Sequence, residues 1–190
     1  MTGLLTFFVI LALPAIYGVF LFNQLVALKH SVGKAWSNID ILLKQRHDEL
    51  PKLVETCKQY MQFEQETLEK VMQARSQVAS ARALQNIPAL GQAEDALRLG
   101  LGNLFAVAEA YPELKTNETF QHLQVRITGL EEAIADRREF YNDSVNVNNV
   151  RVEQFPDTLV ARLFGFRQFS LLQFAAEEKK DVDLKQLFNN

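Results

Sequence analysis

The chain has 190 residues, of which 48% are hydrophobic, and a formal net charge of −3. This length suits one domain, and the slightly acidic balance without a basic block excludes a nucleic-acid-binding role. Only one cysteine occurs, Cys57, so no intramolecular disulfide can form. Since it falls on an apolar seam with Leu50 and Leu53, we expect a small core residue and not a reactive thiol.

The N-terminal stretch, residues 3–28, contains no charged side chain, and the first charge of either sign is Lys29. About 20 apolar residues in a helix cover roughly 30 Å, the thickness of the hydrocarbon core of a bilayer. We therefore predict a transmembrane anchor over residues 1–28 that contacts lipid through residues 3–28. A cleaved signal peptide fits less well, because a positive leading region and a small-residue cleavage site are missing. A buried core helix is a weaker alternative, because no face of the run is polar.

The basic residues beside this span predict its orientation. The flank after the span carries Lys29, His30, Lys34, Lys44 and Arg46, whereas the flank before it carries no basic side chain. Because positively charged flanks stay in the cytoplasm, we predict that the N-terminus lies outside and the body lies in the cytoplasm.

Beyond the span, apolar residues recur every three or four positions from Val32 to Val78, which predicts one helical face over about 50 residues. Arg46, Glu64 and Arg75 interrupt this seam, and Arg137 and Asn148 fall on a later one. Arg46 and Arg137 should find carboxylates or extend their heads to water, because an unpaired buried charge is costly.

Pro51 is the one helix breaker in this long seam. It lacks the N–H that would bond to the carbonyl of His47, so a kink or a restart is expected, and we predict a marked break. Asp48 is a suitable N-cap for a restarted helix, with Pro51 in its first turn.

Further along the chain, residues 85–88 read as a loop, residues 89–111 as a shorter helix that stops before Pro112, and residues 112–116 as a second loop. Glycines at 91, 100 and 102 would let a neighbouring backbone approach closely. Asn117 is a plausible N-cap for a long helix that Pro156 ends. Asp157 is then expected to cap a short turn that Gly165 closes.

These elements predict an all-α fold in which an N-terminal transmembrane helix precedes a long antiparallel helical bundle of about four helices. We expect the bundle over residues 29–167. A C-terminal tail, residues 168–190, is expected to pack partly on it.

Three parts of the chain carry recognisable motifs: residues 22–32 with 35–54, the run Ala-Glu-Ala-Tyr-Pro-Glu-Leu-Lys at 108–115, and a set of single positions near the C-terminus. That set is Arg138, Tyr141, Asn142, Val145, Asn149, Val152, Phe155-Pro156 and Phe164-Gly165-Phe166. In their order and spacing, these segments resemble the LemA family. There are departures: the second Tyr-Asn pair of the family is Asn148-Asn149 here, and the pair near the membrane is Phe22-Asn23. If those tyrosine hydroxyls serve a binding site, the departures weaken it.

The resemblance implies a bacterial inner-membrane protein with one N-terminal span, a helical-bundle body and no established catalytic activity. One branch of the family takes part in building magnetosome membranes, and nothing in the sequence assigns this chain to that branch.

Two polar stripes are the candidate partner-binding residues. One lies on the helix after the span, and the other lies on the last long helix. A polar groove between them would bind the helix or loop of a partner, whereas solvated faces or a register-fixing polar layer are the alternatives. Trp36, on an apolar seam, fits the core as well as a partner contact. The predicted set is Trp36, Asp40, Lys44, Asp48, Arg138, Tyr141, Asn142 and Asn149.

No catalytic, cofactor-binding or metal-binding residue is predicted. The three histidines, His30, His47 and His122, form no H-E-x-x-H or paired E-x-x-H pattern, and no glycine-rich phosphate loop or G-x-S-x-G occurs. We therefore predict a membrane-anchored scaffold or adaptor that binds other proteins, with a second copy of the chain as another partner. The alternative is a membrane-bound enzyme or cofactor carrier whose site is unrecognised.

Overall fold

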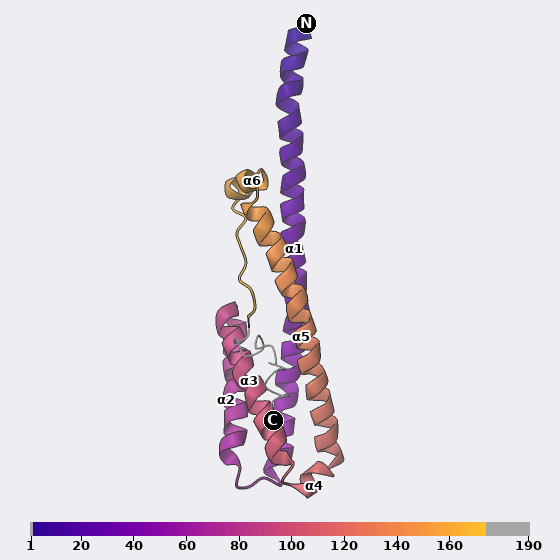
Figure 1. The fold of residues 1–190 in the computed structure, drawn as a ribbon, viewed down its shortest axis with the longest axis vertical. Helices are drawn as coiled ribbons and strands as arrows, with labels where there is room; N and C mark the ends of the chain where they lie inside the picture. The colour runs from indigo at the N-terminus through magenta and orange to yellow at the C-terminus, as the bar shows by residue number, and fades with distance from the viewer. Residues whose placement is uncertain (1, 174–190) are drawn as a thin grey trace, which may run out of the picture. The chain divides into compact units, whose positions relative to one another are not determined.

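The computed structural model describes residues 2–173, and within them the regular structure is entirely helical. The all-α fold class is thereby confirmed. Of the tail predicted at 168–190, residues 174–190 lie outside the described residues. The helices, labelled in Figure 1, are α1 (Thr2–Lys58), α2 (Gln65–Ala83), α3 (Ile87–Ala108), α4 (Pro112–Lys115), α5 (Glu118–Glu153) and α6 (Asp157–Phe164).

The chain forms two compact units, and both of them use parts of α1 and α5. We call Met1–Ile39 with Asp136–Leu171 the anchor unit, and Asp40–Ala135 with Leu172–Asn190 the bundle unit. The boundaries predicted after residues 28 and 167 divide the chain into anchor, bundle and tail and not into compact units, so that division stays a prediction.

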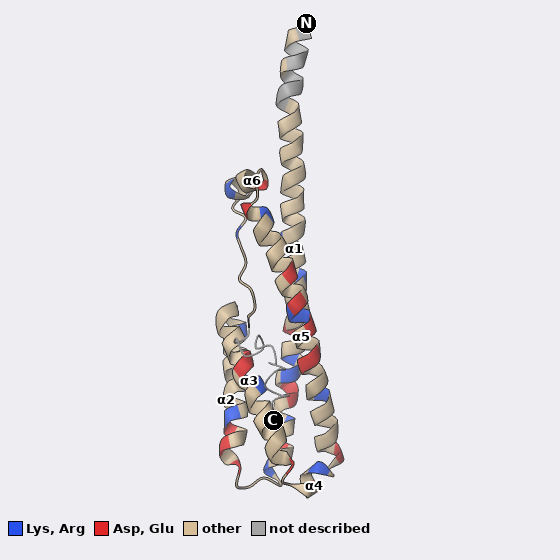
Figure 2. Cartoon of the chain, viewed as in Figure 1, with Lys and Arg blue, Asp and Glu red and all other residues tan. Residues whose placement is uncertain are grey.

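In the anchor unit, α1 changes along its length from an exposed apolar helix to a packed one. Residues 12–20 are exposed apart from the half-buried Gly18, whereas Leu21, Leu25 and Val32 are buried. Within the described residues, α1 is the one helix long and apolar enough to cross a membrane, and no Lys, Arg, Asp or Glu precedes Lys29 in it (Figure 2).

In the bundle unit, α2 and α3 lie side by side and consecutive long helices run antiparallel (Figure 1). Its core consists of the apolar seams that the sequence predicted. Leu50, Leu53 and Cys57 of α1 are fully buried, as are Val71 of α2 and Leu90 of α3. Burial raises the pKa of the Cys57 thiol to about 12, so this cysteine is the core residue that was expected.

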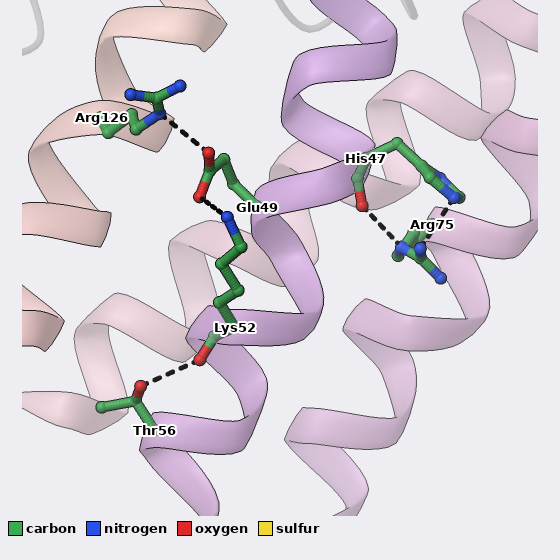
Figure 3. Close-up of polar contacts among 6 residues, drawn as sticks. All are labelled: His47, Glu49, Lys52, Thr56, Arg75 and Arg126. Carbon is green, nitrogen blue, oxygen red and sulfur yellow. Dashed lines mark hydrogen bonds and ion pairs between the residues drawn. The ribbon is translucent and has the colours of Figure 1, made fainter.

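The predicted break at Pro51 is wrong, because α1 continues through it and ends at Lys58, and the chain reverses over residues 59–64. The proline does leave the carbonyl of His47 without its intrahelical donor. Arg75 of α2 supplies a replacement: its Nε donates to that carbonyl at 2.9 Å (Figure 3). Asp48 therefore caps no restarted helix.

The same arginine also contacts the imidazole of His47, with the guanidinium Nη2 at 2.7 Å from Nε2 (Figure 3). Burial of the ring and the positive charge of Arg75 lower the pKa of His47. A neutral ring then accepts the hydrogen bond from the guanidinium. The contact between α1 and α2 thus bridges a backbone position that a proline would otherwise leave unsatisfied.

The remaining boundaries follow the prediction in part: α3 begins at Ile87, inside the loop predicted at 85–88, and ends at Ala108 instead of residue 111. Asn117 caps α5 by accepting from the N–H of Phe120 at 3.0 Å, and Gly165 closes α6 in the left-handed conformation at φ 72°. The loop predicted at 112–116 contains the short helix α4. Asp157, predicted as a cap, lies inside the first turn of α6.

Of the three glycines expected to allow close approach of a backbone, Gly91 does so, because a Cβ there would lie 2.1 Å from the carbonyl oxygen of Gln173. A Cβ at Gly100 would make an ordinary contact, 3.5 Å from a methyl group of Val71, and nothing lies within 4 Å of the corresponding position at Gly102. The expectation is wrong at these two positions.

Candidate functional site: a polar row that holds an extended segment

Three polar side chains of α5 in the anchor unit, Tyr141, Asn148 and Asn149, hold the segment that follows α6. We call them the polar row, and we call residues 166–173 the extended segment. Asn148 donates from Nδ2 to the carbonyl of Arg167 at 3.3 Å. The hydroxyl of Tyr141 donates to the carbonyl of Ser170 at 3.0 Å.

Asn149 makes the most complete of these contacts. Its Nδ2 donates to the carbonyl of Phe169 at 2.9 Å, and its Oδ1 accepts from the N–H of the same residue at 2.9 Å. One side-chain amide thus satisfies both backbone groups of one residue, as a neighbouring β-strand would.

All these contacts address backbone atoms, so the polar row binds an extended chain without reading its side chains. Burial raises the pKa of the Tyr141 phenol, so the hydroxyl stays protonated and available as a donor. The row thus holds an extended backbone of the chain itself by side-chain hydrogen bonds of a helix.

The structure places the predicted partner-binding residues in both units. In the anchor unit, Trp36 packs against Tyr141 with ring centroids 5.8 Å apart at 61°, and Asn149 joins the polar row. Arg138 and Asn142 are half-buried on the same helix.

Three predicted residues belong to the bundle unit. Asp40 accepts from the guanidinium of Arg82, whose Nη2 lies 3.1 Å from Oδ2, while Lys44 and Asp48 are exposed. Hydrogen bonding to Asp40 raises the pKa of Arg82, although partial burial opposes this. This ion pair therefore links α1 to α2.

The sequence reasoning missed Asn148. It stands on the apolar seam of α5, where the periodicity counted it among the core positions, and it is indeed buried. An asparagine at such a position must find hydrogen-bond partners, since burying an unpaired amide is costly. That requirement was the available signal, but its partner lies 19 residues away in a segment of irregular structure.

A second polar cluster lies in the core of the bundle unit, around Arg46. Its guanidinium binds Glu94 of α3 at 2.5 Å and Glu131 of α5, with side-chain exposures of 1%, 3% and 22% in that order. The expectation that Arg46 finds carboxylates is confirmed. Arg137 is exposed, which agrees with the other expected outcome, extension of the head to water.

The charges in this cluster depend on one another. Burial alone would lower the pKa of Arg46, but Glu94 and Glu131 outweigh it and raise that pKa. Burial raises the pKa of Glu94, against the opposing effect of Arg46. Arg46 is thus the group that allows a carboxylate to remain in this core.

Nearer the surface, Glu49 accepts from Nε of Arg126 at 3.0 Å and from Lys52 at 3.1 Å (Figure 3). The pair with Arg126 connects α1 with α5 in the bundle unit, whereas the pair with Lys52 lies within α1. Over residues 2–173, no group of three or more His, Cys, Asp or Glu side chains is arranged to hold a metal ion. The polar row is therefore the arrangement on which we base a binding function.

Comparison with known proteins identifies the relatives of this chain. The family model described as "LemA family" matches residues 35–185. The chain is 28% identical to the protein named LemA from Metamycoplasma hominis, over 99% of this chain and 88% of that one. It is also 31% identical to magnetosome protein MamQ 2 from Paramagnetospirillum magneticum, over 46% of this chain and 32% of that one.

Together with the apolar helix α1, these matches indicate a membrane-anchored protein. The family match covers well over half of the residues. The chain belongs to the LemA family.

Proposed function

We propose that this protein is a membrane-anchored helical scaffold that binds other proteins at the cytoplasmic face of a bacterial inner membrane. The observation that carries the proposal is the polar row of α5, whose amides and hydroxyl bind an extended backbone. A row that recognises backbone groups can accept a peptide of a partner by the same hydrogen bonds that hold the chain's own segment.

The orientation rests on the distribution of charge along α1. Lys29 and Lys34 follow the apolar run directly, and Lys44 and Arg46 lie further along the same helix. Basic residues on one flank favour retention of that flank in the cytoplasm. A reporter fused after Asn190 that is active only outside the cytoplasm would contradict this part of the proposal.

A magnetosome role is not part of the proposal, because the similarity to MamQ 2 extends over less than half of this chain. No catalytic step is assigned to it either. Outside the polar row, the proposed partner contacts are Asn142, which is half-buried and follows Tyr141 in α5, and Lys44 and Asp48, which are exposed on α1.

Site-directed photo-crosslinking in native membranes tests the binding function. A benzophenone amino acid replaces Asn142, which lies about two helical turns before Asn149, and the matched control replaces the exposed Val125 of the same helix. The proposal expects a discrete protein adduct at position 142 that weakens when Asn149→Ala is added. Equal adducts at both positions, or none at 142, would refute it, and an adduct of twice the chain mass would identify a second copy as the partner.

A further inference from the structure

Helix α6 exposes an apolar surface that nothing in the anchor unit covers. Phe155, just before the helix, and Leu159, Leu163 and Phe164 within it are between 58% and 78% exposed. For an eight-residue helix this is a dense apolar face, whereas its buried positions include Asp157 and Ala161. Contiguous exposed apolar surface of this kind marks an interaction site.

This surface continues directly into the apolar part of α1. The ring of Phe164 packs edge-on against Phe22, with centroids 4.8 Å apart at 63°. An apolar groove of about 350 Å³ lies between the two helices and is lined by Gly18, Val19 and Leu163, among others. Whatever surrounds the exposed residues 12–20 of α1 therefore also reaches α6.

The charges nearby show where a hydrocarbon layer has to end. Arg151 of α5 donates to the side-chain amide of Gln24 and also pairs with Asp157, at 3.4 Å. A paired arginine and aspartate beside Gln24 would be costly inside hydrocarbon. Leu21 and Leu25 are moreover buried by the protein itself and need no lipid.

The length of the remaining run agrees with that limit. From Gly3 to Phe22 the helix has about 20 residues, and at about 1.5 Å each these cover roughly 30 Å, the thickness of the hydrocarbon core. The run that the sequence assigned to the membrane, residues 3–28, thus extends past Leu21 and Leu25, which the protein itself buries.

We propose that α6 lies in the membrane–water interface, with Leu159, Leu163 and Phe164 in the acyl region, and that the hydrocarbon core ends near Phe22 instead of Leu28. The protein then holds the bilayer at two places, a span and a short in-plane helix. Arg162, which is exposed on α6, sits at headgroup depth. This inference rests on the membrane anchoring in the proposed function, so its test includes a separate probe of the span.

Depth-dependent fluorescence tests the inference. In the full chain carrying Cys57→Ala, a single cysteine is placed at Leu163, labelled with the environment-sensitive dye NBD and reconstituted in phosphatidylcholine–phosphatidylglycerol vesicles. Matched labels go to Phe7 in the span and to Leu99, an exposed leucine of α3. Circular dichroism checks that each labelled chain is helical and therefore folded. If the Cys57→Ala chain does not fold, the same labels are placed in the chain that keeps Cys57, because its buried thiol, with a pKa of about 12, resists labelling.

We expect the emission of the dye at positions 163 and 7 to shift to the blue. We also expect most of its fluorescence intensity to be quenched when the lipids carry bromine or a nitroxide on the acyl chain. Position 99 should show neither effect. Quenching at 7 without quenching at 163 would overturn the inference and leave the anchor standing. If the dye is quenched at neither position, the membrane anchor is overturned as well. A blue-shifted but unquenched dye at 163 would mean that protein, and not lipid, covers α6.

Discussion

The buried cluster around Arg46 gives the sharpest test of how the bundle unit is held together. Replacing Arg46 with methionine keeps much of the side-chain volume but leaves Glu94, 3% exposed, without its cation. Removing one partner of a buried pair typically costs about 3–5 kcal/mol, because the remaining charge is uncompensated. Glu131 is 22% exposed and turns to water at smaller cost.

For a protein of this size, about 1 kcal/mol shifts the melting temperature by about 2–4 °C, so Arg46→Met should lower it by roughly 6–20 °C. Adding Glu94→Leu removes the stranded carboxylate and should restore most of the loss, since apolar replacement of a whole buried pair is often neutral. Thermal unfolding of the full chain in detergent micelles, followed by circular dichroism at 222 nm, measures both variants.

The pair of Arg126 and Glu49 supplies the control, because Arg126 is 51% exposed and Glu49, 11% exposed, keeps Lys52 as a second cation when Arg126→Met is made. It should cost no more than about 1 kcal/mol. If Arg46→Met cost as little as this control, or if Glu94→Leu failed to rescue it, the reasoning about the uncompensated charge would be refuted.

Acidity adds an independent readout of the same cluster. Burial raises the folded-state pKa of Glu94 above its ordinary value, and removing Arg46 raises it further. The folded chain then binds the proton of Glu94 more tightly than the unfolded chain does. The free energy of unfolding therefore gains a contribution below the ordinary carboxyl pKa, and this contribution is lost as the pH rises through the folded-state pKa of Glu94. Arg46→Met should therefore be less destabilised relative to the wild type at pH 5 than at pH 7.5.

Further predictions concern single contacts. Arg75→Met should cost about 1–3 kcal/mol, and less when Pro51→Ala restores the intrahelical donor, which a double-mutant cycle of urea unfolding measures. Cys57 should react with a thiol reagent at pH 8 only after denaturation, as absorbance with Ellman's reagent would show. Asn149→Ala removes two backbone contacts and should speed tryptic cleavage within the extended segment, visible by mass spectrometry. Gly91→Ala forces the carbonyl of Gln173 away, and a methyl resonance of Leu172 that did not shift would contradict the close approach.

Much of the fold was predictable from the chain because it depends on local pattern. The three- and four-residue spacing located the buried seams, Asn117 and Gly165 supplied recognisable ends, and the apolar run before Lys29 identified the candidate span. Such signals lie within a few residues of the structure that they specify, so one sequence is enough to read them.

The errors arose where a distant residue decided the outcome. Pro51 breaks isolated helices, yet α1 continues because Arg75, 24 residues later, takes over the freed carbonyl. The sequence required carboxylates for Arg46 but did not say that they are Glu94 and Glu131. The polar stripe containing Asn149 was predicted to bind a loop, and its holding of the extended segment became visible only in the structure.

Polar residues on the apolar seams of this chain share one physical explanation. Regular helices satisfy their own backbone groups, so donors and acceptors are left over where the regular pattern stops, among other places at Pro51 and in the extended segment. At these two places a seam residue of a neighbouring helix supplies the partner: Arg75 binds the carbonyl of His47, and Asn148 binds that of Arg167. Arg46 differs, because its partners are carboxylates. A polar residue at a seam position therefore points either to an interruption of regular structure or to a buried charge elsewhere in the fold, and finding that partner requires the three-dimensional structure.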